Sequence, residues 1–167
     1  MRAAVTTLFT VTSLAVLAAQ SAGPVRNDTM HLTVNTSISD VEAAPGKKLS
    51  ITFDITPKRS MHVYAPGKHD YQVIAVKIDP QPWLKVAPTN YPPSEIYDFK
   101  ELNEKVEVYS KPFKLVQDIT VLNTAEAKKA LAASPVKLSG RLEYQACDDK
   151  VCYAPTKIPV SFALTAK

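Results

Sequence analysis

Apolar and polar residues alternate along several short stretches of this chain, a pattern that is typical of β-strands with one buried face. Residues 48–56 show it most clearly, because every second residue from Leu49 to Ile55 is apolar and Pro57 ends the run. Similar runs occur around Leu32 and Val34 and at residues 61–64, 71–78, 83–87, 106–109, 113–122, 138–144 and 160–164. With turn residues between them, these runs predict an all-β domain, an immunoglobulin-like antiparallel β-sandwich.

One stretch departs from the strand pattern. Residues 124–134 are rich in alanine, together with lysine and glutamate, and these residue types favour a helix. Thr124 can cap the start of this helix, and Pro135 lies just beyond its end. We predict one short surface helix inserted between two strands.

The first 21 residues have the composition of a secretory signal peptide. Arg2 precedes an apolar run, residues 3–19, and Ala19 and Ser21 fit a small-x-small cleavage site. The alternative is a transmembrane anchor, but hydroxyl residues dilute the run, which falls short of the roughly 20 mainly apolar residues that a span needs. We expect residues 1–21 to be removed and residues 22–167 to form a single exported domain.

Cleavage would leave about 146 residues, which is enough for one domain with its own hydrophobic core. Arg2 is the only charged residue that would be lost, so the formal charge would fall from +4 to +3. A charge this small and dispersed gives no support for nucleic-acid binding.

The chain has only two cysteines, Cys147 and Cys152, and they lie between the alternating runs at residues 138–144 and 160–164. Continuing the first run places Cys147 on its polar face, so we expect this thiol to point outward. The apolar residues of both runs are even-numbered, so if they share one face of a sheet, the residue numbers of two cross-strand partners should add up to an even number. The two cysteines have an odd sum. Either a β-bulge lies beside them or Cys152 has already left the ladder.

Two interpretations of the cysteine pair stay open, a structural brace and a redox-active disulfide. Closing so short a loop would add little chain-entropy stabilisation, and a domain of this size does not need a disulfide to fold. Export to an oxidising compartment would still let the disulfide form. These points favour a reversible, redox-active disulfide near the surface.

Residues 144–155, Tyr-Gln-Ala-Cys-Asp-Asp-Lys-Val-Cys-Tyr-Ala-Pro, resemble the redox-active segment of the N-terminal periplasmic domain of DsbD, the thiol:disulfide interchange protein. The resemblance runs from about Leu32 to Leu164, and the cysteine segment is its specific part, although its cysteine spacing is shorter than in that family. It implies an immunoglobulin-like fold, a periplasmic location and a disulfide that carries electrons to or from thioredoxin-like or client proteins. Full DsbD proteins continue into a membrane domain and a thioredoxin-like domain. Because the sequence stops at Lys167, we expect a stand-alone thiol–disulfide oxidoreductase domain with a separate membrane thiol reductase as its electron donor.

The resemblance also implies residues that shape the site. His62 and Tyr64 look like a variant of the family's aromatic-x-aromatic pair beside the cysteines. His62 could stabilise a thiolate as an imidazolium or act as a general base; alternatively, both side chains only cover the end of a sheet. Asp98 and Phe99, in a proline-rich loop at residues 91–100, are candidates for the family's acidic–aromatic pair, whose ring shields the disulfide. The alternative is that Phe99 anchors this loop to the core.

The same resemblance assigns different roles to the two cysteines. Cys152 is expected to meet the partner, and Cys147 to resolve the mixed disulfide. The residues give modest support, because Cys147 ends a regular strand, whereas Cys152 and Tyr153 lie where the ladder breaks. Asp148 disfavours a thiolate at its neighbour Cys147, and Lys150 favours one at Cys152.

Two further function classes stay open. A non-catalytic immunoglobulin-like binding module could use a structural disulfide to brace a loop, and a copper or zinc handler could use the thiols. For zinc, His31, His62 and His69 would join the cysteines as nominal ligands, but no second Cys-x-x-Cys and no His-x-x-x-His supports such a site. We expect a monomer with no cofactor or metal. Its expected partners are thioredoxin-like proteins and a membrane thiol reductase, with no nucleic acid and no small-molecule substrate.

Overall fold

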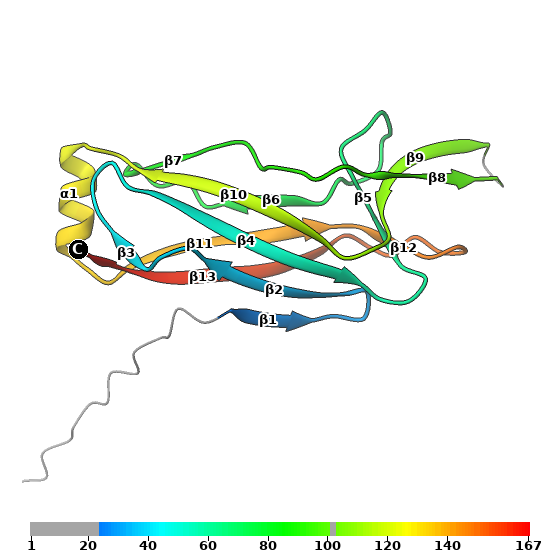
Figure 1. Cartoon of the computed structure of the whole chain (residues 1–167), viewed down its shortest axis with the longest axis horizontal. Helices are drawn as coiled ribbons and strands as arrows, with labels where there is room; N and C mark the ends of the chain where they lie inside the picture. The colour runs from blue at the N-terminus through cyan, green and yellow to red at the C-terminus, as the bar shows by residue number, and fades with distance from the viewer. Residues whose placement is uncertain (1–23, 101–102) are drawn as a thin grey trace, which may run out of the picture.

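The computed structural model describes residues 24–100 and 103–167, so the expected signal peptide at residues 1–21 lies outside the described residues. Two sheets pack face to face, and a third sheet lies at one end of the elongated sandwich (Figure 1). The strand orders are β1-β2-β4-β10-β7 and β3-β13-β11-β6 in the sandwich and β12-β5-β9-β8 in the end sheet. Pairings between these strands are antiparallel except for the short β3–β13 pair. In chain order the elements are β1 Val25–Asp28, β2 Leu32–Ile38, β3 Glu42–Ala43, β4 Lys48–Pro57, β5 His62–Tyr64, β6 Ala75–Ile78, β7 Leu84–Val86, β8 Glu95–Phe99, β9 Glu104–Tyr109, β10 Phe113–Val121, α1 Ala125–Ala132, β11 Val136–Tyr144, β12 Ala146–Cys147 and β13 Thr156–Ala166.

The core lies between the two large sheets and follows the predicted alternation. In β4 the four apolar residues from Leu49 to Ile55 are at most 1% exposed, while the residues between them are half-buried. Burying one such side chain stabilises the fold by about 1.5–3 kcal/mol relative to leaving it exposed. The facing sheet contributes a matching set of buried side chains, among them Leu138, Leu142, Ile158, Val160 and Leu164. The sandwich therefore has a large core that does not depend on the disulfide.

Helix α1 confirms the predicted surface helix. The Thr124 hydroxyl caps it by accepting a hydrogen bond from the backbone N–H of Ala127 at 3.2 Å. Ala127 and Leu131 are buried against the core. The helix lies at the end of the sandwich opposite β12 and the end sheet (Figure 1). Among the described residues, no helix is long and apolar enough to cross a membrane.

Four strands were not predicted: β1, β3, β8 and β12, of which β3 and β12 have only two residues each. The prediction of a loop at residues 91–100 was wrong in part, because β8 begins at Glu95 and pairs with β9. The alternation is obscured there, since Ile96 is exposed while Tyr97 and Phe99 are only half-buried. Strand β1 is an edge strand without a buried residue, so it has no apolar face to reveal it.

Candidate functional site

The cysteines lie where β11 and β13 separate at the end sheet. Every pair of partners along these strands has an even index sum, as predicted, and the last pair is Tyr144 with Thr156. Beyond this pair, Cys147 lies opposite Cys152. Cys147 comes three residues after Tyr144, whereas Cys152 comes four residues before Thr156. The segment between Cys152 and Thr156 therefore has one extra residue. Of the two expected alternatives, Cys152 has left the ladder: β13 begins only at Thr156, and the two cysteines face each other in an isolated bridge that is one residue out of register with the ladder.

The two cysteines form a disulfide, with their Cα atoms 4.1 Å apart, and their exposures differ. Cys147 is fully buried, whereas Cys152 is exposed. The prediction that the Cys147 thiol points outward was wrong. Strand β12 has left the sandwich and pairs with β5, where Cys147 belongs to a second small core built around Tyr64, Val106 and Val108. Of the two cysteines, Cys152 is therefore the one that is open to solvent.

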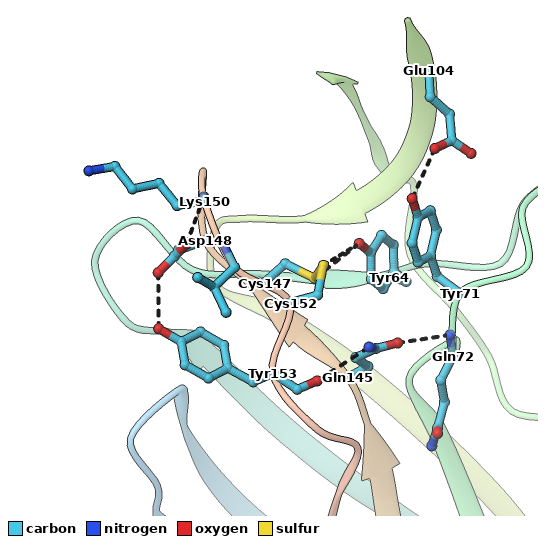
Figure 2. Close-up of a disulfide and its surroundings, with 11 residues drawn as sticks. Tyr64, Tyr71, Gln72, Glu104, Gln145, Cys147, Asp148, Lys150, Cys152 and Tyr153 are labelled. Atoms are coloured by element: carbon cyan, nitrogen blue, oxygen red, sulfur yellow. Dashed lines mark hydrogen bonds between the residues drawn. A yellow bond between two sulfur atoms is a disulfide. The ribbon is translucent and has the colours of Figure 1, made fainter. Parts of the chain in front are cut away.

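Tyr64 lies directly against the disulfide (Figure 2). Its hydroxyl oxygen is 3.0 Å from Sγ of Cys147 and 3.3 Å from Sγ of Cys152. Burial raises the pKa of Tyr64 to about 12, so the phenol keeps its proton at neutral pH. Because disulfide sulfurs carry no hydrogen, the Tyr64 hydroxyl is the donor in these contacts. It can also donate to a thiolate that forms when the disulfide breaks.

A second tyrosine, which the sequence did not single out, supports Tyr64. The rings of Tyr64 and Tyr71 stack, with centroids 4.3 Å apart and planes 5° from parallel. The Tyr71 hydroxyl donates to Oε2 of Glu104 at 2.9 Å, and this hydrogen bond is the main cause that raises the pKa of Tyr71. Tyr71 and Glu104 are far apart in sequence and meet only because β9 joins the end sheet. No local pattern predicts this contact.

His62 lies opposite Cys147 in the β5–β12 pairing and is 2% exposed. Its ring stacks on Tyr97, with centroids 4.6 Å apart, and meets Tyr64 edge-on. Its buried Nε2 has no hydrogen-bond partner within the described residues. Burial lowers the pKa of His62, against smaller opposing effects from two nearby aspartates. The imidazolium form is therefore disfavoured at neutral pH, and so is stabilisation of a thiolate by a His62 cation.

The structure separates the two residues of the expected acidic–aromatic pair. Phe99 is half-buried, packs edge-on against His62 at 6.0 Å between centroids, and joins the second small core. Asp98 is exposed, and because successive side chains of a strand point to opposite faces, its carboxylate lies away from that core. The acidic residues beside the disulfide belong to the cysteine loop instead, where Asp149 accepts a hydrogen bond from Tyr97 at 2.7 Å.

Phe99→Ala should speed reduction of the disulfide by glutathione about fivefold, because the ring packs against the second small core and its removal should open a second approach, to the buried sulfur of Cys147. The free energy of unfolding should fall by only about 1 kcal/mol, since the ring is half-buried. Reduction kinetics and urea unfolding measure the two effects. Phe113→Ala is a matched control, because Phe113 is also half-buried but stacks on Tyr109. A large loss of stability with an unchanged reduction rate would show that Phe99 is only a core anchor.

Tyr153 lies on the side of the disulfide opposite Tyr64 (Figure 2). Its hydroxyl donates to Oδ2 of Asp148 at 3.0 Å, and this hydrogen bond raises the pKa of Tyr153. Asp148 also accepts hydrogen bonds from the backbone N–H groups of Lys150 and Val151, which are the main cause that lowers its pKa. The Asp148 carboxylate is therefore ionised at neutral pH and is bonded within the cysteine loop.

The three histidines do not converge on the cysteines. The His31 ring lies 4.5 Å from the Tyr153 ring, tilted by 44°. His69 has its Nε2 2.9 Å from the Ala65 carbonyl oxygen, and His62 meets the Tyr64 ring edge-on. In the part of the chain that the structure describes, no group of three or more His, Cys, Asp or Glu side chains is placed to hold a metal ion.

Two solved structures resemble this fold to different degrees. The N-terminal periplasmic domain of ScsB from Proteus mirabilis matches with a TM-score of 0.56 at 14% sequence identity, over 86% of this chain and 51% of that chain. This chain thus spans about half the length of that structure. The GAE domain of yeast GGA1 matches with a TM-score of 0.43 at 9% identity, over 85% of this chain and 99% of that chain. The predicted immunoglobulin-like β-sandwich is confirmed.

Sequence comparison identifies the family. No curated protein sequence matches the chain. The family described as "Thiol:disulfide interchange protein DsbD, N-terminal" matches residues 29–163. This match includes both cysteines, Tyr64 and the whole end sheet, and the cysteines form the disulfide that thiol–disulfide interchange requires. The chain belongs to the family of DsbD N-terminal domains.

Proposed function

We propose that this domain is a periplasmic thiol–disulfide interchange module, which passes electrons through a reversible Cys147–Cys152 disulfide. The observation that carries the proposal is the asymmetry of the pair: Cys152 is exposed, while Cys147 is buried against the Tyr64 hydroxyl. Exchange needs one sulfur that a partner thiolate can reach and one that can leave and return. A structural brace needs neither this asymmetry nor a hydroxyl directed at both sulfurs.

Loading the domain with electrons begins when a partner thiolate attacks Sγ of Cys152. The Cys147–Cys152 bond breaks, Cys147 leaves as a thiolate beside the Tyr64 hydroxyl, and a mixed disulfide joins Cys152 to the partner. A second partner thiol then displaces Cys152, so the partner becomes oxidised and the domain holds two thiols. Delivery to a client disulfide reverses these steps, and Cys147 resolves that mixed disulfide by attacking Cys152.

The proposed partners are thioredoxin-like proteins, with a separate membrane thiol reductase as the electron donor. Membership in a thiol:disulfide interchange family supports partners of this class. The ScsB domain of similar fold is a periplasmic one, which supports the same location for this domain, with residues 1–21 as its signal peptide. We propose that the domain acts as a monomer, without nucleic acid or a small-molecule substrate.

The redox potential of the disulfide tests this function. Equilibration with glutathione should give a potential above roughly −300 mV, because structural disulfides that resist the glutathione pool lie below that value. The double variant Cys147→Ser/Cys152→Ser is the control and should show no redox transition. A lower potential, with no reduction by a thioredoxin-like protein, would favour a non-catalytic binding module with a structural disulfide.

A further inference from the structure

Asp148 follows Cys147 directly and organises the loop that leads to Cys152. Its Oδ1 accepts hydrogen bonds from the backbone N–H groups of Lys150 at 2.8 Å and Val151 at 2.7 Å. Its own backbone N–H donates to the Val151 carbonyl at 3.0 Å. The residues between the cysteines are thus bonded to one another through a single carboxylate. Hydrogen bonds to an ionised acceptor are stronger than those between neutral groups.

Tyr153 connects this loop to the body of the domain. Its hydroxyl is the third donor to Asp148, at 3.0 Å from Oδ2. Its backbone N–H donates to the Ala146 carbonyl at 2.9 Å, and its ring lies 4.5 Å from that of His31, which is 6% exposed. The Tyr153 ring therefore packs against His31 at the start of β2, and from this position its hydroxyl donates to Asp148. Neither Asp148 nor Tyr153 has a hydrogen bond to a sulfur among the contacts of the described residues.

The two cysteines meet only if the loop stays closed. When the disulfide is reduced, the covalent link is gone, and the loop is held by its hydrogen bonds alone. How often the two sulfurs then lie within bonding distance sets the effective concentration of one thiol at the other, and so the equilibrium for closing the disulfide. Contacts that preserve the loop in the dithiol form favour closure.

We propose that Asp148 and Tyr153 are positioning residues, which keep Cys147 and Cys152 close together in the dithiol form and so set how readily the disulfide closes. The inference rests on the proposed interchange function, and it assigns to this pair a different task from that of Tyr64. Tyr64 contacts the sulfurs themselves, whereas Asp148 and Tyr153 act on the loop that carries them. Loss of the pair should therefore slow the resolving step and weaken closure, without slowing attack by an external thiol on Cys152.

Tyr153→Phe tests the proposal with the least disturbance, because it keeps the ring on His31 and removes only the hydroxyl. The equilibrium constant for closing the disulfide, measured in glutathione buffers, should fall about fivefold, which is a rise in potential of about 20 mV. Asp148→Ala should lower it about tenfold, because all three hydrogen bonds are lost. The double variant should be no lower than Asp148→Ala, since both substitutions remove the same contact. Tyr91→Phe is the control, because it removes a tyrosine hydrogen bond to the Ile74 carbonyl, outside the cysteine loop, and should leave the potential unchanged.

The difference in stability between the oxidised and reduced protein separates positioning from a merely structural contact. The closed loop makes these hydrogen bonds fully in the disulfide form but only part of the time in the dithiol form, so Tyr153→Phe should destabilise the oxidised domain more than the reduced domain, by the same fivefold factor in the unfolding constant. Closing constants within twofold of the wild type for both Tyr153→Phe and Asp148→Ala would overturn the inference. Equal destabilisation of the oxidised and reduced variants would overturn it as well. Failure of the proposed function would look different, because the wild-type domain itself would then not exchange with a thioredoxin-like protein.

Discussion

With Cys147 replaced by serine, Cys152 should accumulate a stable mixed disulfide with a thioredoxin-like protein. The partner can be prepared with a single cysteine, activated as its thionitrobenzoate disulfide. Exposed Cys152 can attack this disulfide, and once Cys147 is gone nothing in the domain resolves the product. In Cys152→Ser the remaining sulfur is the fully buried Cys147, so complex formation should be at least about tenfold slower. Release of thionitrobenzoate gives the rate, and non-reducing electrophoresis gives the yield.

The trapped complex also identifies the reacting sulfur. Mass spectrometry of the linked peptide should find the partner on Cys152, and the variant without either cysteine should give no complex. Serine is close to cysteine in size, and the core of the sandwich is separate from the disulfide, so both single variants should fold. If the complex instead builds up through Cys147, the roles of the two sulfurs are reversed.

Tyr64→Phe should slow reduction of the disulfide by a thioredoxin-like protein about 10- to 100-fold. The departing Cys147 thiolate would lose the hydroxyl 3.0 Å from its sulfur, and a hydrogen bond to a charged group contributes about 1.5–3 kcal/mol. A less stabilised thiolate is a poorer leaving group. The phenyl ring can still stack on Tyr71, so the fold should persist. Stopped-flow fluorescence of the partner during reduction measures the rate.

Tyr109→Phe is a matched control for Tyr64→Phe. Tyr109 is also buried, burial likewise raises its pKa to about 12, and its hydroxyl donates to the Pro92 carbonyl at 2.8 Å rather than to a sulfur. Its substitution should leave the reduction rate unchanged. Faster reduction of Tyr64→Phe would show that the hydroxyl only obstructs access to the disulfide.

Much of the sandwich could be predicted because its signals are local. Strands such as β4 and β11 bury one face, so buried apolar residues alternate with more exposed residues along them. Helix α1 has an alanine-rich composition and a capping threonine within one short stretch. Four strands escaped prediction. Strands β1 and β8 lie at sheet edges and have no fully buried residue, and β3 and β12 have only two residues each, so the same physics leaves no pattern there.

The site was predictable only where residues adjacent in sequence carry it. The cysteine segment indicated a disulfide and an irregularity in the ladder beside it, and the structure places His62 and Tyr64 next to Cys147. The burial of Cys147 could not be predicted, because it depends on the end sheet, which brings together segments far apart in the chain. The stacking of Tyr71 on Tyr64 has the same long-range origin.

The segment from Cys152 to Thr156 is one residue longer than the facing segment from Tyr144 to Cys147, and this extra residue decides whether the two sulfurs meet. Without it, the even register of β11 and β13 would continue, and Cys147 would face Tyr153 in place of Cys152. Deleting one residue from the segment at residues 153–155 should therefore part the sulfurs, although both cysteines and the number of residues between them stay the same. In comparing such domains across species, the count from the second cysteine to the following strand is as informative as the count between the cysteines. An alignment gap placed in that short interval would mark a domain that has lost its disulfide geometry.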